Sequence, residues 1–144
     1  MPKKPKKRRD TLNPSVVSAM NAILEKGPIV SPVAVLMEMG RLSANDCENW
    51  RFGRVPFLEQ VITGNLSICE RIIKIIRFEA GMKSLTPSFT VYHKYGNGKK
   101  IRLRFSKTGN PFIEILYSTH YVSHHLLAKA RQQVSSEDTP GDQI

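Results

Sequence analysis

The sequence is poor in acidic residues, in cysteine and in long apolar runs. Its 144 residues include 12 Asp and Glu against 22 Lys and Arg, with two cysteines and one tryptophan. No apolar run approaches the ~20 residues that span a bilayer, and no secretory h-region follows the basic start. Cys47 and Cys69 are therefore expected to be reduced and partly buried. We expect an intracellular protein with no membrane partner.

Sequence motifs of catalysis are also missing. There is no phosphate-binding loop, no G-x-S-x-G, no H-E-x-x-H and no C-x-x-C. Asp46 and Glu48 are the one close acidic pair outside the termini, and their spacing suits Mg²⁺ poorly. His120, His124 and His125 include an i, i+4 pair but have no further zinc ligands nearby in sequence. We expect no enzyme, no cofactor and no metal, and a small metal-dependent nuclease is the least favoured alternative.

The region from 71 to 107 concentrates the positive charge of the chain. It contains ten Lys and Arg and a single acid, Glu79, so it carries +9 of a formal net charge of +10. A cationic surface of this density attracts a polyanion. We expect the partner to be a nucleic acid, with DNA favoured over RNA.

Residues 67–80 have the pattern of an amphipathic helix. Ser67 and Glu70 have the spacing of a capping box, and Gly81 stands where a left-handed terminator is expected. The apolar positions recur with helical periodicity at Cys69, Ile72, Ile73, Ile76 and Ala80. A second stripe is cationic and comprises Arg71, Lys74 and Arg77. Such a stripe is either a contact for phosphates or the ordinary solvated face of a helix.

Residues 89–105 alternate with the period of β-strands around Gly96-Asn97-Gly98, which predicts a hairpin. A two-residue loop at Asn97-Gly98 would pair Tyr92 with Leu103 and mix polar and apolar side chains on each face. A three-residue loop, 96 to 98, pairs Tyr92 with Arg102 and sorts the faces. Because a slip of one residue reverses every side chain, we expect the three-residue loop.

The outer face of the predicted hairpin carries a tyrosine among lysines and arginines. Like charges at this spacing repel one another unless an anion lies over them. Lysines on an exposed strand can instead protect its edge from pairing with other sheets. The arginines and the tyrosine favour nucleic acid, since Arg binds phosphate in a bidentate manner and an aromatic ring stacks on bases. The predicted contact residues are Arg71, Lys74, Arg77, Tyr92, Lys94, Lys100, Arg102 and Arg104.

A second candidate surface lies at Trp50, Arg51 and Arg54. Trp and Arg are frequent at the centres of protein interfaces. An alternative function is therefore an adaptor that binds an acidic protein or another partner, and a homodimer contact could use the same residues. The competing interpretation buries Trp50 in the core and lets the arginines extend to the surface.

The remaining chain is predicted to be mainly helical. Helices before the basic one are expected to begin at Asn13-Pro14, Ser31-Pro32, Ser43 and Pro56. Asn110-Pro111 begins another, although alternating β-formers over 111–121 would instead make a third strand; we favour the helix. The predicted fold class is α+β, mainly α: a compact helical bundle of about five short helices, then a basic β-hairpin or three-stranded meander, then a C-terminal helix over about 123–133. A basic helix followed by a hairpin is the order of parts in a winged helix.

Three parts are expected along the chain: a disordered basic arm at 1–12, a single globular domain at 13–133 and a disordered acidic tail at 134–144. Lys3 to Arg9 has the composition of a nuclear-import signal and also of a phosphate-binding arm. The expected location is the nucleus in a eukaryote, or the cytoplasm and nucleoid in a bacterium.

Overall fold

A computed structural model describes the backbone of residues 11–138 and the side chains of residues 11–132. The predicted basic arm lies outside the described residues apart from its last two positions. The predicted acidic tail lies outside them beyond residue 138. The predicted division of the chain at 12–13 and 133–134 therefore stays a prediction.

Five helical segments precede the hairpin, as predicted. They are α1 (Leu12–Lys26), α2 (Pro32–Glu38), α3 (Ala44–Arg51), the 3₁₀ helix η1 (Leu58–Val61) and α4 (Leu66–Met82). The later helices are α5 (Pro111–Ser118) and α6 (His124–Asp138), and the strands are β1 (Ile29–Val30), β2 (Thr86–Phe89) and β3 (Thr119–Val122). The predicted class, α+β and mainly α, is confirmed.

Side-chain caps begin several of these helices. Ser31, Ser43 and Asn110 each accept a hydrogen bond from a backbone N–H of the first turn, as predicted. The predicted cap of α4 is wrong, because Asn65 and not Ser67 is the N-cap. The Oδ1 of Asn65 accepts a hydrogen bond from Ile68 N at 2.9 Å. An Asx cap two residues upstream thus satisfies the helix start before Ser67 is reached.

Three other helix ends differ from the predicted ones. The helix expected to begin at Pro56 is the 3₁₀ helix η1, which begins at Leu58. α1 begins at Leu12, ahead of the expected Asn13-Pro14 start. In α4 the glycine at 81 is helical and the helix continues to Met82. After the end of α4 the residue with positive φ is Ser84, at 59°, so a serine takes the left-handed conformation that was expected of Gly81.

The three strands form one antiparallel sheet in the order β1-β3-β2. β3 lies in the middle, with Val122 opposite both Ile29 and Thr86. The stretch predicted as either helix or strand is both, since α5 ends at Ser118 and β3 begins at Thr119. β3 pairs with β2 rather than with the second arm of the hairpin, so the sheet is not the simple meander. The sequence does not predict β1, which has two residues.

The hairpin that follows β2 has a different register from the predicted one. His93 lies opposite Arg102, and Leu103 N donates to Tyr92 O at 2.8 Å. This is the register of the two-residue loop, so the predicted three-residue loop is wrong. The physical reason is burial, because Tyr92 and Leu103 are 9% and 8% exposed while Val91 is 38% exposed. The core beneath the hairpin takes up the tyrosine ring in place of the smaller valine.

The core beside the hairpin centres on Trp50, which is fully buried. Its Nε1 donates to Arg104 O at 2.8 Å, and its ring centre lies 5.5 Å from Tyr92 and 5.0 Å from Phe105. Phe105 in turn stacks on Tyr117 of α5, with ring centres 5.2 Å apart. These contacts attach both the hairpin and α5 to α3.

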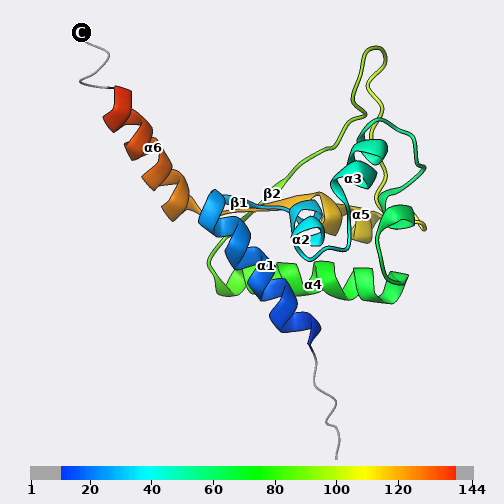
Figure 1. Cartoon of the computed structure of the whole chain (residues 1–144), viewed down its shortest axis with the longest axis horizontal. Coiled ribbons are helices and arrows are strands. Elements are labelled where there is room, and N and C mark those ends of the chain that lie inside the picture. The colour runs from blue at the N-terminus through cyan, green and yellow to red at the C-terminus, as the bar shows by residue number, and fades with distance from the viewer. Residues whose placement is uncertain (1–10, 139–144) are drawn as a thin grey trace, which may run out of the picture.

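Figure 1 shows how the elements are arranged. α4 lies along one side of the body, where α1 crosses and packs against it, and the hairpin projects from the opposite side. α6 points away from the body. None of the described helices is both long enough and apolar enough to cross a membrane.

Candidate nucleic-acid interface

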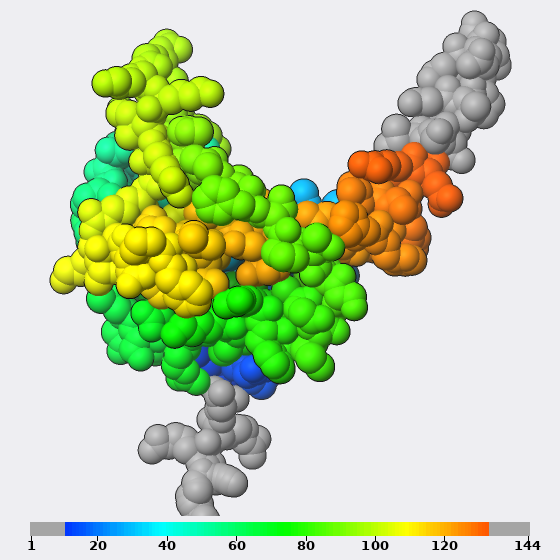
Figure 2. Space-filling model, turned by 180° about the vertical axis from the view of Figure 1, so that it is seen from behind, coloured from blue at the N-terminus to red at the C-terminus, as the bar shows by residue number. Residues whose placement is uncertain are grey.

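The predicted cationic helix and cationic hairpin lie at different ends of the molecule. Figures 1 and 2 both show the hairpin projecting on one side of the body and α4 on the other. Lys94 and Lys100 belong to the hairpin, whereas Arg71, Lys74 and Arg77 lie on α4. The structure therefore does not bring the predicted contacts together in one compact patch.

α5 lies between these two regions and has a hollow on each side. The larger one, called the Arg102 hollow below, has a volume of about 710 Å³, and its lining includes Phe89, Arg102, Arg104, Pro111, Glu114 and Ile115. The smaller one, the Arg77 hollow, has a volume of about 360 Å³, and its lining includes Arg77, Leu85, Pro87, Phe112, Ile115 and Tyr121. Ile115 borders both, so the two hollows adjoin across α5. Figure 2 shows this face, with α5 between α4 and the segment that leads into the hairpin.

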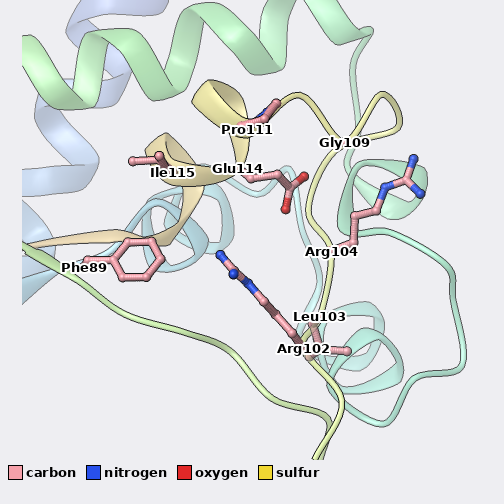
Figure 3. A pocket seen from close by; sticks show the side chains of 8 residues that line it. All are labelled: Phe89, Arg102, Leu103, Arg104, Gly109, Pro111, Glu114 and Ile115. Atoms are coloured by element: carbon pink, nitrogen blue, oxygen red, sulfur yellow. The ribbon is translucent and has the colours of Figure 1, made fainter.

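The Arg102 hollow combines an exposed aromatic ring with an arginine that has no polar partner. Phe89, the last residue of β2, is 53% exposed. The guanidinium carbon of Arg102 lies 5.7 Å from the centre of that ring, and Figure 3 shows the side chain reaching towards Phe89 and α5. Among the side chains of residues 11–132 and the described backbone, Arg102 has no hydrogen-bond partner and no ion pair. Its guanidinium N–H groups are therefore available to a ligand.

Arg104 lines the same hollow but is used by the chain itself. Its Nε donates to Ser106 O at 2.7 Å, and a second guanidinium nitrogen donates to Lys107 O. The guanidinium also lies over the ring of Phe57, 5.5 Å from its centre. Figure 3 shows Arg104 pointing away from Arg102. Arg104 shapes the loop before α5 and has fewer N–H groups left for a ligand than Arg102.

The carboxylate of Glu114 holds the start of that loop. Its two oxygens accept hydrogen bonds from Phe105 N at 3.1 Å, from Ser106 N at 2.7 Å and from Ser106 Oγ at 2.6 Å. Three donors thus balance a half-buried negative charge. The acid that lines the hollow is engaged inward and does not neutralise Arg102.

Glu59 of η1 holds the next part of the loop in the same way. It accepts hydrogen bonds from Lys107 N at 2.9 Å and from Tyr117 OH at 2.7 Å. Burial, reinforced by this carboxylate, holds the pKa of the Tyr117 phenol far above its ordinary value. Both carboxylates therefore accept hydrogen bonds from the loop at 105–107, and Glu59 also accepts one from the buried Tyr117.

The Arg77 hollow has a similar mixture of charge and aromatic surface. Phe112 is 50% exposed beside Arg77, whereas Tyr121 is buried. Burial raises the pKa of Tyr121, and the nearby charge of Arg77 opposes that rise. Lys74, one turn earlier on α4, has its Nζ 3.5 Å from a carboxylate oxygen of Glu70. Both partners are exposed, so this pair is weak and can exchange for a phosphate.

Arg51 anchors the projecting hairpin to α3. Its guanidinium lies 4.0 Å from the ring centre of Tyr95 and 4.9 Å from that of Tyr92. A terminal nitrogen donates to His93 O at 3.1 Å, and Tyr95 N donates to Arg51 O at 2.7 Å. Arg51 therefore fixes the base from which the cationic hairpin projects.

The predicted protein-binding patch is not assembled on the surface. Trp50 is fully buried and Arg51 packs beneath the hairpin. Arg54 is exposed, donates to Asn49 Oδ1 at 3.0 Å and lies over the ring of Phe52. The structure agrees with the competing interpretation, in which Trp50 lies in the core.

Tyr92 is also part of the core. Its ring packs against Trp50 and Phe105, and its hydroxyl lies 2.7 Å from His120 Nε2. Its predicted position on the outer face of the hairpin is wrong, because the observed register turns it inward. At 9% exposure its ring has no open face on which a base could stack.

Metal-binding clusters are not found among the described residues. No group of three or more His, Cys, Asp and Glu side chains in that part of the chain could hold an ion, and this includes Asp46, Glu48 and the histidines at 120, 124 and 125. Both cysteines are free thiols, and burial raises the pKa of each.

Sequence reasoning missed three apolar side chains that border the hollows. Phe89, Phe112 and Ile115 were not among the predicted site residues, yet they are 53%, 50% and 47% exposed. The composition of α5 could have predicted that some of its apolar side chains are exposed. Its eight residues include Phe112, Ile113, Ile115, Leu116 and Tyr117, which is more apolar surface than one face of so short a helix can bury.

Comparison of the chain with models of protein families, with curated proteins and with solved structures gave no match. The case for a function therefore depends on the geometry and charge described above.

Proposed function

We propose that this protein binds nucleic acid, with DNA favoured over RNA, through the surface formed by the Arg102 hollow, α5 and the Arg77 hollow. One observation carries the proposal: Arg102, without a polar partner among the described residues, lies beside the exposed ring of Phe89. Arginine binds phosphate oxygens through several N–H groups, and an exposed ring stacks on bases. The stretch from 71 to 107, with ten basic residues and one acid, supplies the surrounding positive potential.

The cationic side chains take different parts in this proposal. Arg102 and Arg77 contact phosphates on the two sides of α5. Lys74 and Arg71 extend the contact along α4, and Lys94 and Lys100 extend it along the hairpin, as a wing contacts the backbone beside a recognition helix. Phosphate contacts of this kind fix position on the nucleic acid and carry no sequence information by themselves.

Two of the predicted contact residues contribute less to this proposal: Arg104 has a smaller role in binding nucleic acid, and Tyr92 has none. Arg104 supports the loop at 106–107 and contributes charge more than hydrogen bonds. Tyr92 is left out, since its ring is buried. A protein that binds DNA in this way works inside the cell, in the nucleoid or the nucleus.

A second candidate function uses the same surface. Phe89, Phe112 and Ile115 are apolar and exposed, and arginine beside exposed apolar groups is typical of protein interfaces. An acidic segment of another protein is the alternative ligand. Both candidate functions use the positive charge of this surface. A direct measurement of nucleic-acid binding distinguishes between them.

The test uses the full-length chain beside a full-length variant whose arm carries glutamine at Lys3, Lys4, Lys6, Lys7, Arg8 and Arg9. Labelled single-stranded DNA, duplex DNA and RNA are titrated with each protein at several salt concentrations. We expect the arm-neutral variant to keep binding DNA, with an affinity that falls steeply as salt rises, because the described surface neutralises phosphates. If the arm-neutral variant binds none of the three, the arm alone explains the charge and the proposal is wrong.

A further inference from the structure

The Arg102 hollow differs from a plain cationic surface in its shape and lining. Its volume of about 710 Å³ falls within the ~300–1,000 Å³ range of small-molecule sites. Phe89 stands on one side of it, and Pro111 and Ile115 of α5 stand on the other (Figure 3). A phosphate backbone needs only surface charge, so the apolar walls require a ligand that also has a flat apolar part.

The polar groups of the hollow leave one cation free for that ligand. Glu114 is held by three hydrogen-bond donors of residues 105 and 106, and Arg104 is held by the loop carbonyls of 106 and 107. Arg102 has neither kind of partner in the part of the chain described. A bound anion would therefore gain hydrogen bonds at Arg102 without breaking any that the chain now makes.

Resting on the proposed function, we propose that the Arg102 hollow receives an unpaired nucleobase of single-stranded nucleic acid. The base lies against the ring of Phe89, and its phosphate is bound by the guanidinium of Arg102. In a duplex the base faces are covered by their neighbours, so only an unstacked base can offer its face to a side chain in this way. The neighbouring Arg77 hollow, with Phe112 exposed beside it, continues the path of the strand across α5.

Nucleic acid fits this surface better than a peptide does. A peptide could add to the free edge of β2, but Pro87 lies in that edge strand and removes one of its N–H donors. An acidic peptide would meet the charge but would not need a hollow with an exposed ring beside the arginine. In a nucleotide the phosphate matches Arg102 and the base matches the ring of Phe89.

The experiment compares Phe89→Ala with a matched control, Phe78→Ala, in the full-length chain. Phe78 is an exposed phenylalanine of α4 that lines neither hollow. The probes are a labelled oligothymidylate, a strand of the same length made of abasic sites, and a hairpin duplex, each titrated by fluorescence anisotropy. Because both rings are largely exposed, both variants should keep the circular dichroism spectrum of the native chain.

We expect Phe89→Ala to weaken binding of the oligothymidylate by roughly 5- to 140-fold, since stacking of one base on a ring is worth about 1–3 kcal/mol. Its binding of the abasic strand and of the duplex should change less than about twofold. Phe78→Ala should bind all three probes as the native chain does. Phe89→Tyr, which keeps the ring, should bind the oligothymidylate like the native chain.

The inference is overturned if Phe89→Ala binds all three probes as the native chain does, or loses the abasic strand and the duplex to the same extent as the oligothymidylate. It is also overturned if polyglutamate displaces the oligothymidylate at an equal concentration of charges, which would assign the hollow to an acidic protein segment. In the first two outcomes nucleic-acid binding itself still stands. If the native chain binds none of the probes, the proposed function has failed as well.

Discussion

Tyr92 and His120 form a hydrogen-bonded pair between the hairpin and β3. The phenol oxygen lies 2.7 Å from His120 Nε2, and the two rings meet edge to face. Burial of the imidazole lowers the pKa of His120 below its ordinary value. In the neutral form Nε2 can accept the phenol proton, whereas in the protonated form it is a donor and the bond must be rearranged. The guanidinium of Arg51, over the Tyr92 ring, adds a positive charge close by.

This pair makes the stability of the fold depend on pH in a defined direction. The folded state holds a proton on His120 less readily than the unfolded chain does. The contribution of the neutral imidazole to the free energy of unfolding is therefore fully present above about pH 6.5, the ordinary pKa of histidine. It is lost as the pH falls from there towards the lowered pKa of the folded state. We expect urea unfolding between pH 8 and pH 5 to show a smaller loss of stability in His120→Gln than in the native chain.

The matched control for that measurement is His125→Gln, which removes an exposed imidazole of α6. Its loss of stability over the same pH range should equal that of the native chain. An equal loss in His120→Gln and the native chain would show that the Tyr92–His120 contact does not carry the pH dependence.

Single residues could be predicted where the cause is local. Ser31, Ser43 and Asn110 cap their helices as expected, because the acceptor and the N–H that it binds are two or three residues apart. Tyr92 could not be placed in this way. Its position depends on Trp50 and Phe105, which lie more than ten residues away in sequence and offer a pocket that Val91 would not fill.

At the scale of elements, α4 is the helix on which the Arg77 hollow depends. Its buried stripe of Cys69, Ile72, Ile73, Ile76 and Ala80 was predicted in full, because helical periodicity is itself the cause of the burial. Its start was predicted wrongly because Asn65 and Ser67 are both good caps, and the backbone before the helix decides between them.

Two substitutions distinguish these caps. Asn65→Ala removes the acceptor of the Ile68 N–H and should lower the free energy of unfolding by about 1 kcal/mol. Ser67→Ala changes an exposed residue inside the first turn and should alter the free energy of unfolding by less than about 0.5 kcal/mol. Urea unfolding of both variants measures the difference. A larger loss for Ser67→Ala than for Asn65→Ala would contradict the observed cap.

The hairpin and α5 show why the candidate site was predicted only in part. The concentration of charge between 71 and 107 is a property of the sequence and was found there. The hollows are a property of packing. The larger of them exists because the observed register turns Tyr92 inward and leaves Phe89 exposed on the side of Arg102. The pattern of polar and apolar residues does not decide between the two registers of the hairpin, since each register agrees with part of that pattern.

At the scale of the whole molecule, positive charge is divided between two distant elements that α5 connects. α4 and the hairpin lie on opposite sides of the body (Figures 1 and 2), and the two hollows beside α5 lie between them. A ligand that uses both must be extended and anionic. This arrangement is the reason for proposing a nucleic-acid strand that crosses α5, with Arg77 and Arg102 as its nearest phosphate contacts.

The most direct test of this account is the salt dependence of single-stranded DNA binding by the full-length Arg77→Gln/Arg102→Gln double variant. Its control is Lys26→Gln/Arg131→Gln, which removes two exposed cations of α1 and α6 that line neither hollow. Each phosphate contact on a single strand contributes about 0.7 to the slope of log affinity against log salt concentration. We predict that the double variant loses about 1.4 from that slope while the control keeps the native value. An unchanged slope in the double variant, or an equal loss in the control, would contradict the account.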